Sequence, residues 1–430
     1  MPQIGLIENA HNDLVTDAAY DFYGLRLATC SLDQRCVLIK VWALDERQGS
    51  WSVEDDWKAH DAAITKVSWA HPEFGNIIAS SSFDRTVKVW EQTAYTDTDN
   101  AASGSSTASR WVERAVLVDA KGTVRAVEFS PHHFGLRMAT ISSDNHLRVY
   151  ECLEQPSLQT WQLAEEVDVQ SLPSRNPTGH SMPQTVTLST PTQTSSTLDG
   201  ASATLAAHAL AQQQQQNQTQ ARPGLGNREA DGGWCLSWCK DRYWGQVIAV
   251  GCGVNGIVKV IQVSHSRRPA TLLVLDPSPS RVPGGDGTPR TPAQPEGDGP
   301  TPFSVTSVAW APSCGRSYHL IATGSRDGRV RIWRVKPPSP LDEGDREDGD
   351  AEEGTWSASI VGDFDDHKSP IGRVEWNITG TVLASSGNDG RVRLWKATAG
   401  NVWRPAGHIS VEQAEEQQND VEMDDNAVQE

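Results

Sequence analysis

Two parts of the sequence each combine a histidine, a serine and an aspartate, which are the residue types of a hydrolytic catalytic triad. A tryptophan follows the aspartate at the same distance in both, and the two sets are His60, Ser80, Asp84 and Trp90, and His367, Ser385, Asp389 and Trp395. A triad occurs once in an enzyme and faces a cleft, whereas this set recurs in register. We therefore expect a structural role, in which the polar groups of each set satisfy one another inside a repeated unit.

Three glycines, Gly251, Gly253 and Gly256, match the G-x-G-x-x-G pattern of dinucleotide-binding folds. In those folds a helix begins at the glycines and places its N-terminus on the pyrophosphate. Here the next residues, 257–261, alternate in the way typical of a strand, and Asn255 stands where other copies of the repeat have aspartate. The pattern predicts a hairpin turn and no nucleotide cofactor.

The cysteines and the paired histidines do not have the spacing of a metal site. Cys235 and Cys239 are four residues apart, and Cys252 lies in the next predicted strand. Zinc would need a fourth ligand, and residues four apart in a strand extend over roughly 13 Å. His132 and His133 fall in a predicted turn. We expect the cysteines to be small core residues and the histidines to be exposed, with no metal, no cofactor and no enzymatic activity.

Internal repeats account for most of the sequence. The segment 78–90 returns as 321–333 and 383–395, and looser copies occupy 27–42, 138–150 and 248–261. Each copy predicts a hairpin with its turn at Asp or Asn. An alternating run precedes each hairpin, at 15–20, 64–69, 124–129, 234–238, 305–310 and 371–376. A more polar strand follows, with an aromatic residue in five copies, at Trp51, Trp111, Trp161, Trp356 and Trp403. Four strands in a unit of about 40 to 45 residues predict an all-β, six-bladed WD-repeat β-propeller.

The predicted propeller spans 11–408, with blades at about 11–58, 60–118, 120–167, 230–275, 303–361 and 367–408. Turn-rich or low-complexity insertions interrupt it at 93–109, 171–229, 277–302 and 337–354, and an acidic tail follows at 409–430. Such compositions cannot bury enough surface to offset the entropy of ordering, so we expect disorder there. Residues 35–38 lengthen blade one by three residues relative to blade two, either as a bulge or longer turn or as an artefact of the gene model.

The net charge of -18 is concentrated in two acidic runs, at 342–353 and in the tail. The predicted propeller is therefore near neutral and lacks the basic surface that phosphate binding requires, so direct binding of nucleic acid is not expected. The seven cysteines are scattered, no signal peptide is apparent, and no run of about 18 apolar residues exists. We expect an intracellular protein that does not insert into a membrane.

The two ends of the repeat region predict an open ring. The first unit begins with its own inner strand and the last ends with its own fourth strand, so no strand is left to join them. Uncovered strand edges and apolar blade faces are a liability, and a partner could cover them by adding strands. The residues expected at this seam are Val15, Ala18, Tyr20 and Leu38 in blade one, and Val374, Val382, Val402 and Trp403 in blade six. The alternative is a six-bladed ring that closes on itself.

Several motifs are closer to one family than to WD repeats in general. They are HNDLVTD (11–17), DFYGLRLATCS (21–31) and WAHPEFG (69–75) in blades one and two, and VDAKGTV (118–124), SPHHFGLRMAT (130–140), RVYEC (148–152) and LQTWQL (158–163) in blade three. The first three resemble two related families, the COPII outer-coat propeller and the small WD-repeat propeller nucleoporins of the Y-shaped nuclear pore complex. The blade-three motifs are similar to the nucleoporins. The resemblance covers all six blades and excludes the insertions, whose length suggests a fungal form.

The resemblance implies an open propeller that an α-solenoid nucleoporin completes by inserting a blade in trans, and it implies no catalysis and no cofactor. It identifies the two repeated sets with the hydrogen-bonded tetrad of WD repeats. It further implies a scaffold role at the nuclear pore in the nuclear envelope, with other Y-complex subunits as partners, in support of nucleocytoplasmic transport, mRNA export and protein import. A second implied role is in a vacuolar complex upstream of TOR signalling.

Three rival functions stay open at this point. The first is a COPII-type coat propeller. The second is a ubiquitin-ligase substrate receptor, although the Trp-Asp-x-Arg strand ending that is common in such receptors is replaced here by Trp333, Arg334 and Val335. The third is a propeller hydrolase, for which the sequence offers no nucleophile, base or metal set.

Overall fold

The computed structural model describes residues 7, 9–32, 38–95, 108–155, 157–173, 229, 231–264, 267–277, 303–338 and 355–410. The predicted insertions, the acidic tail and residues 35–37 of the extra segment in blade one lie largely or wholly outside these residues. All strands belong to one compact unit formed by residues 1–175 and 231–430. No helix of the described part is long and apolar enough to cross a membrane.

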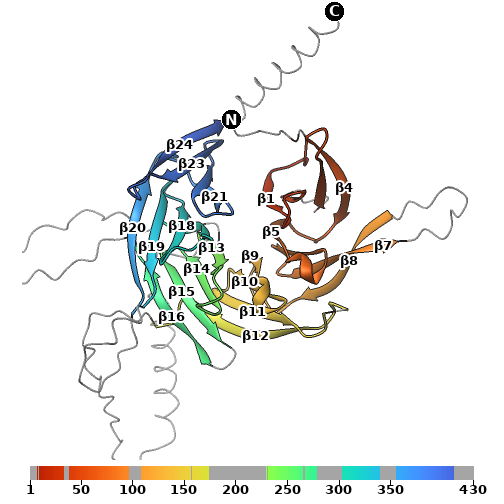
Figure 1. Ribbon diagram of the computed structural model, residues 1–430. Helices are drawn as coiled ribbons and strands as arrows, with labels where there is room; N and C mark the ends of the chain where they lie inside the picture. Colours follow the sequence, from red (N-terminus) through yellow and green to blue (C-terminus); the bar gives the residue numbers. More distant parts are fainter. Residues whose placement is uncertain are drawn as a thin grey trace, which may run out of the picture. The chain divides into compact units, whose positions relative to one another are not determined.

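The unit consists of six four-stranded antiparallel sheets, each made from four strands that are consecutive in the sequence (Figure 1). Blade one contains β1 (Val15–Tyr20), β2 (Arg26–Ser31), β3 (Leu38–Asp45) and β4 (Ser50–Lys58). Blade two contains β5 (Ile64–Trp69), β6 (Ile77–Ser82), β7 (Val87–Tyr95) and β8 (Ala108–Leu117). Blade three contains β9 (Val124–Phe129), β10 (Arg137–Ser142), β11 (His146–Cys152) and β12 (Trp161–Asp168).

The second half repeats this order. Blade four contains β13 (Gly233–Trp238), β14 (Val247–Gly253), β15 (Val258–Ser264) and β16 (Arg267–Leu275). Blade five contains β17 (Val305–Trp310), β18 (His319–Ser325), β19 (Val330–Lys336) and β20 (Ser357–Phe364). Blade six contains β21 (Ile371–Trp376), β22 (Val382–Gly387), β23 (Arg391–Ala397) and β24 (Trp403–Ser410). Two short 3-10 helices, η1 (Pro72–Phe74) and η2 (His132–Phe134), connect the first two strands of blades two and three. The prediction of an all-β, six-bladed WD-repeat propeller is confirmed.

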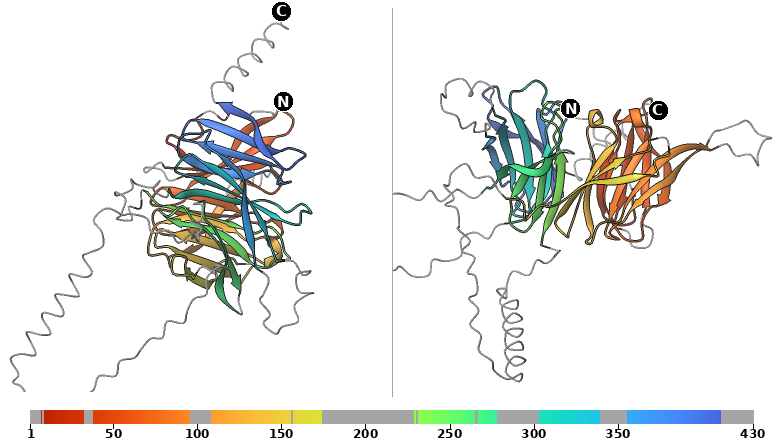
Figure 2. Two further views of the ribbon diagram at one scale, coloured as in Figure 1. Left: turned by 90° about the vertical axis from the view of Figure 1, so that its left-hand side faces the viewer. Right: turned by 90° about the horizontal axis from the view of Figure 1, so that it is seen from below.

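The sheets twist, as β structure does, and two further views show the blades from the side (Figure 2). Five of the first strands carry a β-bulge at their second residue, which is Thr16, Thr65, Arg125, Thr306 or Gly372. A bulge leaves one residue out of the ladder and redirects its side chain. These five residues therefore share a position from which a side chain can reach the next blade.

The glycine-rich segment of blade four forms the hairpin turn between β14 and β15, and no helix follows it. Gly253 and Gly256 have φ angles of 84° and 69°, in the left-handed region that glycine adopts at low cost. The backbone N–H of Ile257 donates to the side chain of Asn255 at 3.4 Å. The glycines thus serve a tight turn.

The core lies between blades. Five clusters of buried apolar residues each join one pair of consecutive blades, from the pair of blades one and two to the pair of blades five and six. Among the residues that the structure describes, no such cluster joins blade six to blade one. The largest fully buried side chains include Trp238, Trp310 and Trp395, which fill the space between neighbouring sheets.

Candidate functional site: the seam between blades six and one

The first His-Ser-Asp-Trp set forms a continuous chain of hydrogen bonds within blade two. His60 Nδ1 lies 2.9 Å from Asp84 Oδ2, and its Nε2 lies 2.8 Å from Ser80 Oγ. The indole N–H of Trp90 donates to the same hydroxyl oxygen at 2.9 Å. Burial alone would raise the pKa of the Asp84 carboxyl, but hydrogen bonds from His60 and Thr86 hold that pKa well below its usual value. Because Ser80 has no exposed surface, its hydroxyl is out of reach of a substrate.

The second set repeats this geometry in blade six. His367 Nδ1 lies 3.0 Å from Asp389 Oδ1, its Nε2 lies 2.8 Å from Ser385 Oγ, and Trp395 Nε1 donates to that oxygen at 2.8 Å. Burial raises the pKa of Asp389, but hydrogen bonds from Arg393 and His367 outweigh it and lower the pKa to about 2. Both sets join strands within a blade, and the serine of each set has no exposed surface.

In two further blades, an arginine of the third strand bonds to the turn aspartate and to the serine two residues before it, a contact that was not predicted from the sequence. In blade three, Arg148 Nη1 donates to Ser142 Oγ at 2.7 Å, and its Nη2 donates to Asp144 Oδ2 at 2.8 Å. Arg331 of blade five donates to the equivalent serine and aspartate at 3.2 and 3.0 Å. The recurrence of Ser-x-Asp followed by Arg four residues later was the available signal.

Blade one has a third form of the network, in which threonine replaces serine. His11 Nε2 lies 2.8 Å from Thr29 Oγ1, and the indole N–H of Trp42 donates to that oxygen at 2.9 Å. The position of Asp33, where other blades place the aspartate, lies outside the described residues.

The seams between consecutive blades are closed by hydrogen bonds as well as by apolar cores. The bulged threonines Thr16, Thr65 and Thr306 donate to the carbonyl oxygens of Ile64, Val124 and Ile371 in the next blade, at 2.7, 2.8 and 2.6 Å. The indole N–H groups at the ends of three first strands donate back to the preceding blade, from Trp69 to Ala19, from Trp238 to Glu128 and from Trp376 to Ala309, at 2.9, 3.1 and 3.0 Å. A sealed seam therefore has a hydroxyl or indole contact between first strands in addition to its core.

The seam between blades six and one lacks these residue types. Gly372 stands where a threonine would reach forward, and Tyr20, with 59% of its surface exposed, stands where a tryptophan would reach back. A Cβ placed on Gly372 would have only atoms of Ser386, in its own blade, within 4 Å. At the seam of blades four and five, a Cβ on Gly233 would lie 1.9 Å from the carbonyl oxygen of Val305. Across the described strands, the first strands of consecutive blades approach each other more closely at the other five seams than β21 and β1 do.

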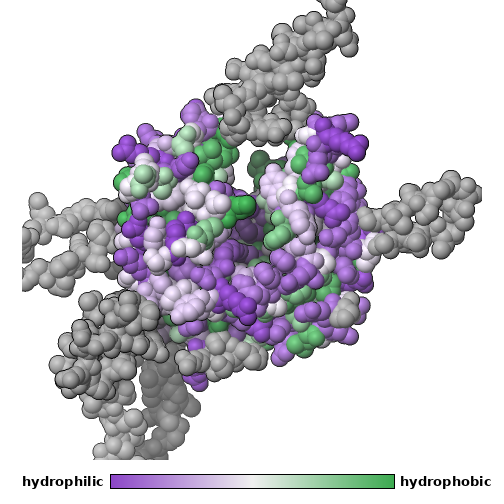
Figure 3. All heavy atoms as spheres, viewed as in Figure 1, coloured by the Kyte–Doolittle hydropathy of each residue, from purple (hydrophilic) through white to green (hydrophobic). Residues whose placement is uncertain are grey.

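Hydrophobic residues border this seam on both sides, and the surface is hollowed between the two blades (Figure 3). In blade one, Val15 and Tyr20 are exposed, and Ala18 and Leu38 are half-buried. Tyr20 pairs with Leu27 and Ala18 pairs with Thr29, whereas the intervening Ala28 packs against blade two. The side of blade one that carries Ala18 and Tyr20 therefore faces the seam.

Two of the predicted seam residues of blade six lie on the wrong side of the sheet. Val374 and Trp403 are buried in the core that blade six shares with blade five. Val382 is half-buried and Val402 is 52% exposed. Val374 and Trp403 were expected at the seam because they are apolar. Strand alternation, however, turns both side chains toward blade five.

Strand alternation also identifies seam residues that the sequence analysis missed. Trp395 and Leu383 face blade five, so Val392, Leu394 and Ala384 are on the opposite side of β22 and β23, toward blade one. Val392 has 37% of its surface exposed. In the closed blades the equivalent residues, such as Ala79 and Val89 of blade two, are buried by the following blade.

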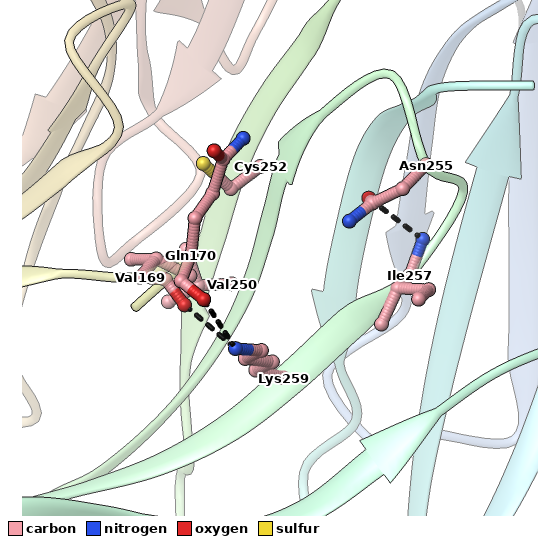
Figure 4. A pocket seen from close by; sticks show the side chains of 7 residues that line it. All are labelled: Val169, Gln170, Val250, Cys252, Asn255, Ile257 and Lys259. Carbon is pink, nitrogen blue, oxygen red and sulfur yellow. Dashed lines mark hydrogen bonds between the residues drawn. The ribbon is translucent and has the colours of Figure 1, made fainter. Parts of the chain in front are cut away.

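A cavity of about 210 Å³ lies beside the hairpin between β14 and β15 (Figure 4). The ammonium group of Lys259 donates to the carbonyl oxygens of Val169 and Leu172, both at 2.8 Å, and to that of Gln170 at 3.3 Å. Burial lowers the pKa of Lys259. Because its donors already have acceptors, the lysine anchors the end of blade three and leaves the cavity without a free charge for a cofactor.

The cysteines considered as metal ligands are buried in the core. Burial raises the pKa of Cys235, Cys239 and Cys252 to about 12, so the thiols stay protonated at neutral pH. His132 is exposed and stacks on His71 at 4.2 Å between ring centroids, whereas His133 is half-buried and its pKa is lowered by that burial and by the neighbouring His132. In the described part of the chain, no group of three or more His, Cys, Asp or Glu residues is placed to hold a metal ion.

Comparison with known proteins relates these features to a family. The WD domain, G-beta repeat family matches residues 51–91, 297–334 and 358–396. The β-propeller domain of Cps50 (Swd1) from Myceliophteria thermophila shares the fold, with a TM-score of 0.51, 14% identity, and coverage of 93% of this chain and 88% of that one.

Full-length relatives are more informative. Nucleoporin SEH1 of Saccharomyces cerevisiae is 32% identical, over 94% of this chain and 99% of the relative. Nucleoporin seh1 of Schizosaccharomyces pombe is 30% identical, over 95% and 97%. Nucleoporin SEH1 of Homo sapiens is 32% identical, over 92% of this chain and 85% of the relative. The chain therefore belongs to the SEH1 family of nucleoporins, proteins of the nuclear pore complex.

Proposed function

We propose that the chain is a scaffold subunit whose seam between blades six and one receives a blade inserted by an α-solenoid nucleoporin. The observation that carries this proposal is the pattern of the core: five apolar clusters join consecutive blades, and the described residues show none between blades six and one. Apolar surface left in water disfavours the free protein, and strands added by a partner would cover it.

The polar pattern of the seam supports the same proposal. The threonine and tryptophan that link the first strands at the seams of blades one and two and of blades five and six are replaced by Gly372 and Tyr20. These replacements do not favour direct packing of blade six on blade one. They leave valine and tyrosine side chains exposed, against which a sheet from a partner could pack. In this arrangement the propeller contributes a rigid body to the scaffold and performs no chemistry.

Through such an interface the protein would join other subunits of the Y-shaped complex and support nucleocytoplasmic transport, mRNA export and protein import. The same seam would serve a vacuolar coat-like complex upstream of TOR signalling, because one insertion site can accept similar blades from different solenoids. No ubiquitin-ligase function is proposed.

Coexpression with the α-solenoid nucleoporins of the same organism tests the proposal. Tyr20→Asp and Val392→Asp each place a charge in the seam, and we expect at least about a 10-fold loss of affinity because the carboxylate would be desolvated by the inserted blade. Val116→Asp is the matched control, since Val116 is 41% exposed on β8, in blade two. Affinity is measured by biolayer interferometry, and crosslinking mass spectrometry locates the inserted segment. Unchanged binding by both seam variants, or crosslinks confined to another blade, would contradict the proposal.

A further inference from the structure

Nothing in blade six requires a glycine at its bulge. The Cβ of a larger residue at position 372 would contact Ser386 at 3.8 Å, an ordinary van der Waals distance, and the φ angle of Gly372 is outside the left-handed region. A threonine would therefore fit, as it does at the bulges of blades one, two and five. No atom of blade one lies within 4 Å of that Cβ, so a hydroxyl there would lack the close carbonyl acceptor that the bulged threonines of the other seams have.

Arg373, the residue after Gly372, reaches across the seam in place of a bulged threonine. The Arg373 guanidinium forms an ion pair with the carboxylate of Asp17 in blade one, and its Nη1 donates to the carbonyl oxygen of Ala18 at 2.7 Å. Glu375 of the same strand accepts from Arg373 Nε at 3.0 Å and holds the side chain in this direction. An arginine side chain is several ångströms longer than a threonine side chain, so it can bridge first strands that stand further apart.

Asp17 joins three blades at this point. Its side chain is almost fully buried, and its Oδ2 accepts from the backbone N–H of Val67 in blade two at 3.1 Å. Lys66 of blade two approaches the other oxygen at 3.9 Å. Arg373 therefore connects blade six to a carboxylate that is already fixed by blades one and two.

The position of this link differs from that of a simple surface ion pair. It connects residues 356 positions apart in the sequence, at the one pair of neighbouring blades for which the described residues show no shared apolar core. At the other seams, loss of one polar contact leaves the blade spacing fixed by packing. Here the apolar side chains of the described residues on the two sides do not form a common cluster that could fix the spacing, and Arg373 contacts both Asp17 and Ala18 of blade one.

We propose that Arg373 is a positioning residue, which holds blades six and one at a fixed spacing in the partner-free chain and so keeps the seam ready for an inserted blade. The effect on spacing is a property of the chain alone. The effect on binding rests on the function proposed above.

Pulsed electron paramagnetic resonance on the free chain measures the spacing directly. Spin labels are attached at Ser52→Cys and Arg404→Cys, exposed positions on the outermost strands β4 and β24, with Cys36 and Cys314 replaced by serine. We expect a narrow distance distribution for the parent chain and a longer, broader one for Arg373→Met, which preserves length and removes the charge. Arg373→Lys keeps a positive charge and is expected to restore most of the parent distribution.

Arg26→Met is the matched control. Arg26 pairs with Glu54 and donates to Gln92 across the sealed seam of blades one and two, and its side chain is 28% exposed, compared with 29% for Arg373. A purely structural role would lower the melting temperature of both variants and leave both distance distributions unchanged. Equal distributions for Arg373→Met and the parent chain, or equal broadening by Arg26→Met, would overturn the inference.

A second measurement separates this inference from the proposed function. Arg373→Met is expected to bind the coexpressed α-solenoid nucleoporin about 10-fold more weakly, because part of the binding free energy must then set the spacing. If no solenoid binds the parent chain while Arg373→Met still broadens the distribution, the proposed function fails and the positioning role stands. If the parent binds and Arg373→Met binds equally well with an unchanged distribution, the positioning role fails alone.

Discussion

Replacement of Ser80 by alanine should destabilise blade two by far more than the loss of one hydroxyl suggests. Ser80 has no exposed surface, and its Oγ is within hydrogen-bonding distance of two buried groups, His60 Nε2 at 2.8 Å and the indole nitrogen of Trp90 at 2.9 Å. Alanine leaves both groups without their partner inside a dry network, and each unsatisfied buried group costs about 1–3 kcal/mol. We expect the free energy of local unfolding of blade two to fall by about 2–5 kcal/mol. The loss stays below the sum of the two full penalties because the neighbouring side chains can relax around the missing hydroxyl.

Hydrogen exchange is the suitable assay, since a chain of six blades need not unfold in a single step. Amides of β6 and β7 should exchange about 30-fold faster or more, which corresponds to about 2 kcal/mol, while amides of blade five keep their protection. Ser52→Ala, at an exposed position of β4, is the control and should change nothing. A loss below about 1 kcal/mol in β6 and β7 would refute the reasoning that the hydroxyl satisfies both neighbours.

Two further outcomes follow from titrating groups. The folded pKa of Asp389 is lowered to about 2, so its ionised form contributes stability that is complete above the unfolded pKa of about 3.9 and is lost as the pH falls toward 2. Asp389→Asn should therefore flatten the decline in melting temperature between about pH 5 and pH 2. An unchanged slope would contradict this. Among the described cysteines, Cys314 is exposed and should react with maleimide in the native protein. Burial raises the pKa of Cys235, Cys239 and Cys252 to about 12, so these thiols should react only after unfolding. Mass spectrometry of labelled peptides distinguishes the two groups.

The first strand of each blade could be predicted closely from the sequence. The alternating runs at 15–20, 64–69, 124–129, 305–310 and 371–376 coincide with β1, β5, β9, β17 and β21, and the run at 234–238 lacks only the first residue of β13. Alternation is decisive here because the first strands of blades two to five are held between two neighbouring blades and those of blades one and six pack against one, so that side-chain type and burial repeat with a period of two.

The side of the sheet on which a residue lies was harder to predict at the ends of the chain. Val374 was expected at the seam, yet its counterparts Val67, Val127 and Val308 all pack against the preceding blade. Alignment of the repeats with one another carried this information, whereas hydrophobicity alone did not. The link between Arg373 and Asp17 could not be predicted in this way, because it depends on the distance between strands from opposite ends of the propeller.

An open seam is compatible with a stable propeller because most of the packing is between neighbours. In such an array, the total stability is approximately the sum of the stabilities of the individual blades and of the interfaces between adjacent blades. Five interfaces therefore suffice to hold six consecutive blades together. A sixth interface would add stability, but it would also remove the only blade faces on which a partner can extend the same packing. The replacement of threonine by Gly372 and of tryptophan by Tyr20 does not favour direct closure, and Arg373 retains polar contacts with Asp17 and Ala18 across the seam. On the two proposals above, such a seam would stay at a defined width while its apolar faces remain free, and these are the two conditions that a blade supplied by another chain requires.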